Sequence, residues 1–228
     1  MKHPYITTCL CLALLATLVP LAQAANTDLP EVTPEGLHLV PDSRLAIVYA
    51  DPEADLGSYK RVKLLDAYIA FKKNWQRDQQ RSSASRTRPT AQDMERIKNG
   101  LADEFRSSFT KVLEEGGYPV VDEPGDDVLL LRPAIINLDV NAPDIPQPGR
   151  VQSYVNSAGE MTLYVEVYDS ATGDLLAKAM DRKIDDRNAS YYTWANSVTN
   201  RAAAQRILKG WANILLAALN EAKQDTSK

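Results

Sequence analysis

The stretch TAQDMERIKNGLADEFRSSFTKVLEEGG (residues 90–117) has the clearest helical pattern in the chain. Its apolar residues recur at three- and four-residue steps, the spacing that places side chains on one face of a helix. They are Met94, Ile97, Leu101, Phe105, Phe109, Val112 and Leu113. Thr90 and Asp93 have the spacing of a capping box, and a glycine pair, Gly116-Gly117, is a usual helix end. We therefore predict an amphipathic helix between these signals.

Segments typical of β-strands flank this helix. RLAIVYADP (44–52) predicts a short strand, and YKRVKLLDAYIAF (59–71) predicts another that does not alternate cleanly, so we expect a bulge or burial on both faces. VLLLRPAIINLDV (128–140) follows the helix and predicts a long strand, in which Pro133 indicates an edge position or a bulge. Alternation places one set of this strand's residues on a common face: Val128, Leu130, Ala134, Ile136, Leu138 and Val140. Strand, helix and strand in this order are compatible with a right-handed crossover.

The C-terminal half predicts a hairpin and a second long helix. EMTLYVEVYDSATGDLLAKAMDRKI (160–184) alternates, with Asp169 and Gly173 at the turn. Its inward residues are Met161, Leu163, Val165 and Val167. A helix is expected over 191–222, with Trp194, Val198, Leu208, Trp211, Leu215 and Leu219 along one stripe. These elements predict an α+β fold, a two-layer sandwich of a mostly antiparallel sheet with two amphipathic helices on one face.

The N-terminus has the features of an export signal. A positive start precedes an apolar run too short to span a bilayer, and Ala22 and Ala24 have the spacing that signal peptidase requires. We expect cleavage after Ala24 and a periplasmic protein. Cys9 and Cys11 do not follow an apolar run, so lipidation is not expected.

Removing 24 of the 228 residues leaves 204, enough for one domain. We expect a signal peptide (1–24), an N-terminal arm (25–43), a single α+β domain (44–222) and a disordered tail (223–228). Both cysteines lie in the signal peptide, which excludes disulfides and thiolate ligands from the mature chain, and His38 is its one histidine. We therefore expect no metal and no cofactor. With 25 basic and 30 acidic side chains, the mature chain is also a poor candidate for binding nucleic acid.

No motif identifies a reaction. Two adjacent acid pairs, Asp126-Asp127 and Asp185-Asp186, flank turns or strand ends and are typical of solvated residues. Nothing in the sequence fixes a carboxylate beside His38, and no serine lies in a G-x-S-x-G turn. We predict a non-enzymatic protein with no catalytic residues. A hydrolase acting on an envelope polymer through carboxylates is the alternative.

A basic segment after the second strand is a candidate binding site. Residues 72–89 show no regular pattern and carry Lys72, Lys73, Trp75, Arg77, Arg81, Arg86 and Arg88. One interpretation is contact with an anionic partner, including peripheral binding of anionic lipid through residues 72–88. The other is a solvated connection in which Trp75 packs back onto the sheet. Whether this segment meets a second long loop, residues 141–158, depends on the strand directions.

Tyr164 and Tyr168 share the outward face of the hairpin's first strand. Lys178 and Arg182 are their diagonal neighbours on the next strand. Such a face binds sugar or protein, or is covered by the N-terminal arm. Both alternatives are open at this level.

Residues from about 43 to 186 resemble domain-of-unknown-function family 3313, uncharacterised proteins of the Gram-negative envelope. The matching stretches are YADPEADLGSYKRVKLLDAY (49–68), GGYPVVDEPGDDVLLLRPAI (116–135) and EMTLYVEVYDSATGDLLAKAMDR (160–182). The resemblance implies an ordered α+β domain and an envelope location. Members are commonly lipoproteins, a feature this N-terminus lacks, and the family supplies no catalytic residues. Our hypothesis is a periplasmic or envelope-associated protein that binds an envelope component or a partner protein.

Overall fold

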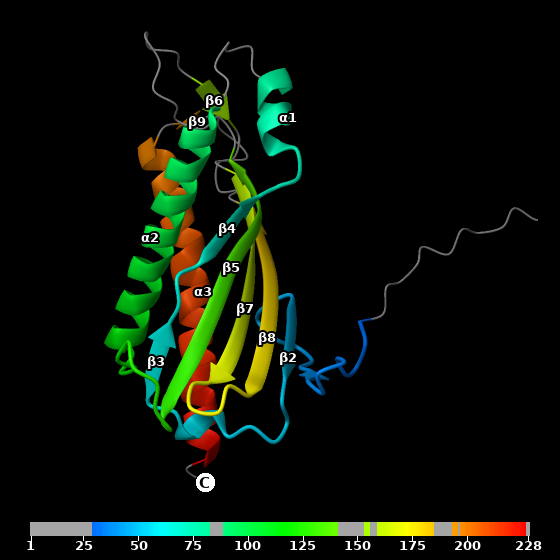
Figure 1. Ribbon diagram of the computed structural model, residues 1–228, viewed down its shortest axis with the longest axis vertical. Helices are drawn as coiled ribbons and strands as arrows, with labels where there is room; N and C mark the ends of the chain where they lie inside the picture. Colours follow the sequence, from blue (N-terminus) through cyan, green and yellow to red (C-terminus); the bar gives the residue numbers. More distant parts are fainter. Residues whose placement is uncertain are drawn as a thin grey trace, which may run out of the picture.

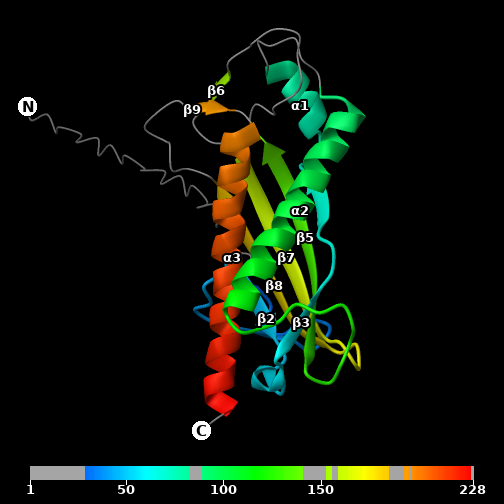
Figure 2. The same cartoon turned by 90° about the vertical axis from the view of Figure 1, so that its left-hand side faces the viewer.

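The computed structural model describes residues 29–82, 89–140, 153–155, 159–184, 193–195 and 197–226. A seven-stranded sheet forms one layer, and two long helices, α2 and α3, form the other on a single face of it (Figures 1 and 2). The strands of this sheet are β1 (His38–Leu39), β2 (Ile47–Ala50), β3 (Arg61–Leu64), β4 (Tyr68–Phe71), β5 (Val128–Val140), β7 (Gly159–Asp169) and β8 (Leu175–Ile184). The helices are η1 (Leu56–Ser58), α1 (Trp75–Ser82), α2 (Ala91–Glu115) and α3 (Ser197–Thr226). β6 (Ser153–Val155) and β9 (Thr193–Ala195) pair separately.

The sheet order is β1-β2-β8-β7-β5-β3, and β4 also pairs with β5. Pairing is antiparallel except where β3 and β4 each run parallel to β5. The predicted α+β sandwich is confirmed. The connection through α2 is a crossover, because it joins parallel strands of one sheet.

Local signals define α2 as expected. The Thr90 side chain accepts a hydrogen bond from the backbone N–H of Asp93, and an Asp93 carboxylate oxygen accepts one from the N–H of Thr90. The helix ends at Gly116, and Gly117 has a φ of 86°, which glycine adopts without steric cost. Leu101, Phe105, Phe109, Val112 and Leu113 are buried against the sheet and α3.

The segment predicted as one irregular strand forms two short strands, β3 and β4. Both pair with β5, and after Leu65, whose N–H donates to the Leu131 carbonyl at 3.0 Å, residues 66–67 leave the ladder. Pro133 is therefore neither on an edge strand nor in a bulge. Pro133 lies opposite the gap between β3, which ends with Leu64 beside Leu131, and β4, which begins with Tyr68 beside Ala134. Because no strand residue faces Pro133 in this gap, its missing N–H costs no hydrogen bond to β3 or β4.

A bulge in β5 also changes the predicted common face. Asn137 has a φ of 53°, and the β5–β7 register shifts between Ile136 and Asp139. Beyond this bulge Leu138 joins the core, whereas Leu130, Ala134 and Ile136 are only partly buried. The core residues before the bulge are instead Leu129, Leu131 and Ile135. The predicted face therefore does not continue through the strand.

Three further boundaries differ from the predictions. Residues 75–82 form α1, although the basic segment shows no regular sequence pattern. The last helix begins at Ser197, and Trp194, which we expected in that helix, belongs to β9. At its other end α3 continues to Thr226, whose hydroxyl donates to Asp55 Oδ1 at 2.7 Å, so residues 223–226 are not part of a tail.

The predicted arm contributes to the sheet. Leu37 is buried and β1 pairs with β2, so residues 29–43 pack against the domain; residues 25–28 lie outside the described chain. Within the described ranges, no helix is both long and apolar enough to cross a bilayer.

Candidate functional site

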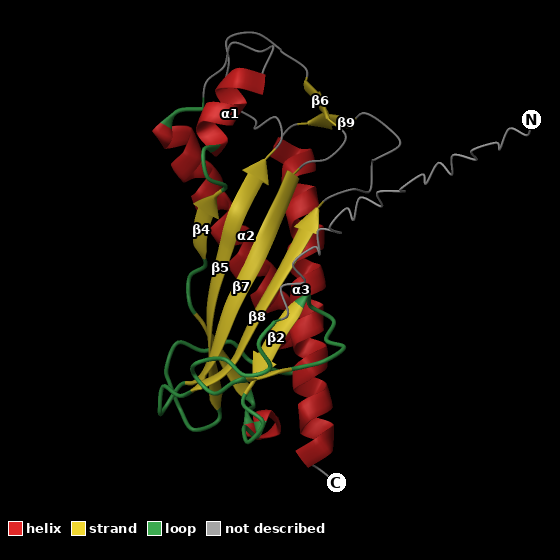
Figure 3. Ribbon diagram, turned by 90° about the vertical axis from the view of Figure 1, so that its right-hand side faces the viewer, coloured by secondary structure: helices red, strands yellow, loops and turns green. Residues whose placement is uncertain are grey.

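Figure 3 looks onto the sheet face opposite α2 and α3. Alternate positions of β5, β7 and β8 place polar and aromatic residues on this face. The register aligns Arg132 on β5, Glu166 on β7 and Lys178 on β8 in one row across the strands. The neighbouring row contains Tyr68, Ala134 and Tyr164, followed by Met180. We call Tyr68, Arg132, Ala134, Tyr164, Glu166 and Tyr168 the outer face.

Glu166 organises this surface. Its two carboxylate oxygens accept hydrogen bonds from the hydroxyls of Tyr164 at 2.7 Å and Tyr168 at 2.8 Å. Burial and these hydrogen bonds raise the pKa of both tyrosines. Burial is the largest single influence on Glu166 and acts to raise its pKa, but the tyrosine hydrogen bonds and the charges of Arg132 and Lys178 together outweigh it, so the pKa is lowered. The carboxylate therefore stays ionised and holds both rings in place.

The described part of the N-terminal arm, residues 29–43, covers one side of this surface. Lys178 donates to Glu35 at 2.7 Å, and Tyr49 donates through its hydroxyl to the carbonyl of Pro30 at 2.9 Å. These contacts place the arm over β2 and β8. The β4 and β5 side remains open, since Tyr68 is 67% exposed and the Arg132 side chain is 66% exposed.

Tyr68 is a residue that the sequence reasoning missed. Its neighbour Ile69 is buried in the core, so alternation along β4 turns Tyr68 outward. The signal was present in the motif DAYIAF, but recognising it required the strand break at residues 65–67. Lys178 and Arg182 lie diagonally from Tyr164, as predicted, but the prediction is wrong for Tyr168, because a register shift pairs that residue with Leu175.

Lys72 lies at the end of the same surface, within a network of ion pairs. Its ammonium is 3.1 Å from Asp139 Oδ2 and 3.6 Å from Glu160 Oε1, and Arg182 also pairs with Glu160. Hydrogen bonding to Asp139 raises the pKa of Lys72. The charge of Lys72 is thus largely matched within the protein.

Trp75 packs inward at the start of α1. The residue is 2% exposed, its ring stacks on Phe71 with centroids 4.2 Å apart, and its Nε1 donates to the carbonyl of Val140 at 3.3 Å. Its ring is therefore buried rather than presented to a partner. Lys73, Arg77 and Arg81 are exposed, whereas Arg86 and Arg88 lie outside the described residues.

The strand directions determine where the two long connections leave the sheet. Because β4 and β5 are parallel, the residues that follow them emerge at the same end. Gln79 of α1 donates to the Val140 carbonyl at 3.2 Å, and α1, β6 and β9 all lie at this end (Figure 1). β4 and β5 therefore end side by side, at one end of the outer face, with α1 against the last residue of β5. Residues 83–88, 141–152 and 156–158 lie outside the described chain, so whether the two loops meet stays open.

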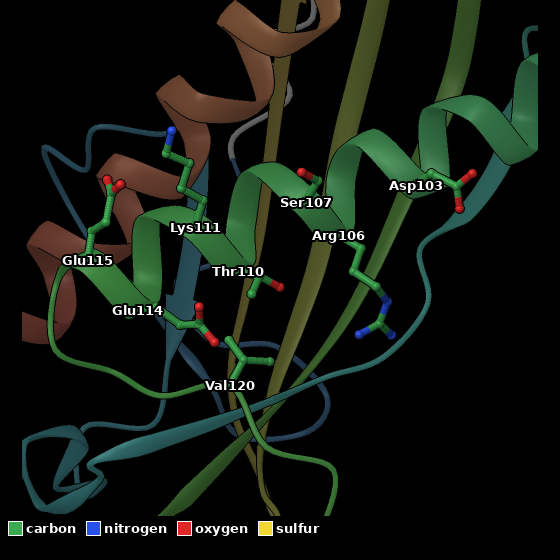
Figure 4. A pocket seen from close by; sticks show the side chains of 8 residues that line it. All are labelled: Asp103, Arg106, Ser107, Thr110, Lys111, Glu114, Glu115 and Val120. Carbon is green, nitrogen blue, oxygen red and sulfur yellow. The ribbon is translucent and has the colours of Figure 1, made fainter.

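Two described carboxylates, those of Asp139 and Glu160, come together, and both pair with the ammonium of Lys72. Asp127 pairs with Arg61, and Asp185-Asp186 lie outside the described chain. An open groove of about 670 Å³ on α2 is lined partly by Asp103, Glu114 and Glu115. Figure 4 shows Asp103 at the far end of this groove from Glu114, with Glu115 pointing away. His38 is exposed in β1.

Metal ligation is also unsupported by the described part of the chain. It contains no group of three or more His, Cys, Asp or Glu side chains arranged to hold a metal ion. The arrangement that the outer face presents is a fixed set of aromatic rings beside an exposed guanidinium.

The fold and this surface define a two-layer α+β domain, and comparison places it in a family. The chain belongs to DUF3313, described as a protein family of unknown function, whose model matches residues 38–215. This confirms the resemblance seen in the sequence. No curated protein matches the chain.

Solved structures show only a loose likeness. A PelC dodecamer from Paraburkholderia phytofirmans is 12% identical with a TM-score of 0.39, covering 74% of this chain and 96% of that one. A Xanthomonas campestris protein of family DUF330 is 14% identical with a TM-score of 0.43, covering 82% and 97%. A DUF4136 protein from Bacteroides thetaiotaomicron is 10% identical with a TM-score of 0.31, covering 79% and 94%. At these scores we draw no functional conclusion from them.

Proposed function

We propose that this protein is a non-enzymatic component of the cell envelope that binds a partner protein through the outer face. One observation carries the proposal: exposed Tyr68 and Arg132 share a sheet face with Tyr164 and Tyr168. Glu166 holds the hydroxyls of these last two tyrosines in place. Tyrosine and arginine are, with tryptophan, enriched at the energetic centres of protein interfaces. Ordering both rings in advance reduces the entropy that binding would lose.

The shape and charge of the surface favour a protein partner. The outer face is an exposed sheet surface, and interfaces between proteins are typically broad and flat rather than deep. Arg132 lies 3.5 Å from Glu166 and is largely exposed, so its guanidinium is available to a carboxylate of the partner. The proposed partner therefore presents apolar side chains and at least one acidic group.

Site-specific photo-crosslinking in living cells tests this function. A photoreactive residue at position 68 should give a discrete adduct, whereas the same residue at position 111 on α2 should not. Tyr68 and Lys111 are both exposed, on β4 and on the helical layer respectively. Equal adducts at both positions, or none at position 68, would contradict the proposed surface.

Once the adduct identifies the partner, affinity measurements test the two residues. Tyr68→Ala and Arg132→Glu should each weaken binding by about tenfold or more, the effect expected of central interface residues. Lys111→Glu is the matched control for charge and exposure. A loss confined to the α2 variant would assign the interface to the helical layer instead.

We also propose export through the N-terminal segment, which the apolar run and the small residues Ala22 and Ala24 support. Intact mass measurement of the protein recovered from the periplasm should show a chain that begins at Ala25. A mass that retains residues 1–24, or that carries a lipid on cysteine, would contradict this prediction. Replacing Ala24 by a large residue should block processing.

A further inference from the structure

The α1 end of the molecule carries a concentration of positive charge. Residues 72–82 contain four cations, Lys72, Lys73, Arg77 and Arg81, and one carboxylate, Asp78. Lys72 is engaged by Asp139 and Glu160, so the cations left to face outward are the other three. We call Lys73, Arg77 and Arg81 the cationic end. It stands out because the chain as a whole has a net charge of −4.

The fold holds this charged segment in a defined orientation. Trp75 is buried against Phe71, and Gln79 donates to the Val140 carbonyl. Gln76 donates to the carbonyl of Pro89 at 2.6 Å, which ties α1 to the segment preceding α2. Because residues 75, 76 and 79 face inward, Arg77 and Arg81 lie on the opposite, exposed side of the helix. In Figure 1, α1 lies beyond the end of the sheet.

The position of α1 permits contact with a flat surface. α1 lies at one extremity of the molecule's long axis, and the C-terminus lies at the other (Figures 1 and 2). The outer face runs along the side of the molecule rather than over this end. A surface that meets the cationic end therefore leaves Tyr68 and Arg132 accessible.

From this charge and placement we infer that the cationic end binds the phosphate-bearing surface of an anionic membrane. Clustered lysine and arginine are attracted to anionic lipid headgroups, by about a fivefold gain in affinity for each cation near the surface. Asp78, whose carboxylate lies 3.7 Å from Arg77 Nε, opposes this attraction. The contact is electrostatic and peripheral, because Trp75 is buried in the protein rather than available to insert into lipid.

Vesicle sedimentation tests the inference directly. The protein should bind vesicles containing 30% phosphatidylglycerol in phosphatidylcholine, but not vesicles of phosphatidylcholine alone. Binding should fall as salt is raised from about 0.1 to 0.5 M, since screening shortens the reach of exposed charges. Binding that is equal on both vesicle types, absent from both, or insensitive to salt would overturn the proposal.

Charge variants assign the effect to α1. The triple variant Lys73→Gln, Arg77→Gln and Arg81→Gln should weaken binding by about 100-fold, and Asp78→Asn should strengthen it severalfold. Lys60→Gln, Lys111→Gln and Lys209→Gln together remove the same charge from exposed positions elsewhere and should have little effect. All variants share one N-terminus, so any contribution of the apolar segment cancels. An equal loss in the control triple would show that net charge, not the cationic end, controls binding.

This outcome is separable from the proposed function. Position 68 would still crosslink to a protein partner if the cationic end bound no lipid. Conversely, the vesicle measurements would stand if the outer face had no partner.

Discussion

Replacing Trp211 by alanine should lower the free energy of unfolding by about 3–5 kcal/mol, the usual cost of removing a buried tryptophan. The residue is 2% exposed and lies on α3, in the core between that helix and the sheet. Its indole Nε1 donates to Asp181 Oδ2 of β8 at 2.7 Å. Truncation therefore creates a cavity and also removes a donor from a buried carboxylate.

Asp181 makes this effect larger than packing alone. Its other carboxylate oxygen accepts from the backbone N–H of Ala46 at 3.1 Å, just before β2, and Lys183 lies 3.0 Å from Oδ2. One buried carboxylate thus joins α3, β8 and the start of β2. Leaving such a group with a lost partner costs about 1–3 kcal/mol or more, because its desolvation is no longer offset.

Urea denaturation followed by circular dichroism measures the prediction. Trp211→Phe retains most of the apolar ring but not the donor, so it separates the hydrogen bond from the cavity and should fall between wild type and Trp211→Ala. Lys209→Ala, at an exposed position of the same helix, should change stability by no more than about 0.5 kcal/mol. A cost for Trp211→Ala near that of Lys209→Ala would mean that α3 is not held by this contact.

Elements with local signals could be predicted from the sequence. α2 has an apolar period, a capping box at Thr90 and Asp93 and a glycine end, and all three act within a few residues. The β7–β8 hairpin is similarly local, because Asp169 accepts from the N–H groups of Ala171 and Thr172 and Gly173 has a φ of 80°. These features depend only on residues that are close together in the sequence.

Features that depend on distant partners could not be predicted. The break between β3 and β4 follows from which residues of β5 each strand meets, and α1 is held by contacts of Trp75 and Gln79 with Val140, over 60 positions later. The short β6–β9 pair likewise joins segments far apart in sequence. None of these has a periodic pattern of its own.

The candidate site shows the same division. Tyr164 and Tyr168 could be assigned to an outward face from alternation alone. The positions of Tyr68 and Arg132 beside these tyrosines depend on the strand register. The register places Tyr68 opposite Ala134 and Arg132 opposite Glu166. The arm's coverage of β8 through Glu35 and Lys178 depends on a contact across 143 positions. The local sequence thus predicts which residues of one strand face outward, whereas the extent of the surface depends on contacts between distant segments.

Replacing Gly159 by alanine should also be strongly destabilising, by about 3 kcal/mol or more. Gly159 begins β7 with a φ of 147°, a conformation that side chains disfavour, and a Cβ there would lie 2.1 Å from the carbonyl oxygen of Asp139. That oxygen belongs to the backbone of β5, directly beside Val140, the register partner of Gly159. Relief of the clash would therefore require β5 and β7 to separate where the outer face meets α1.

Gly173→Ala is the matched control for this prediction. Gly173 also has a positive φ, 80°, but a Cβ at that position would have no atom within 4 Å. Its replacement should cost only the conformational strain of a left-handed residue, about 1–2 kcal/mol. Urea midpoints of the two variants thus separate strain from the steric contact with Asp139. Equal losses would show that the β5 backbone yields to the added methyl group, and that the close approach of these two strands does not set the register at this end of the sheet.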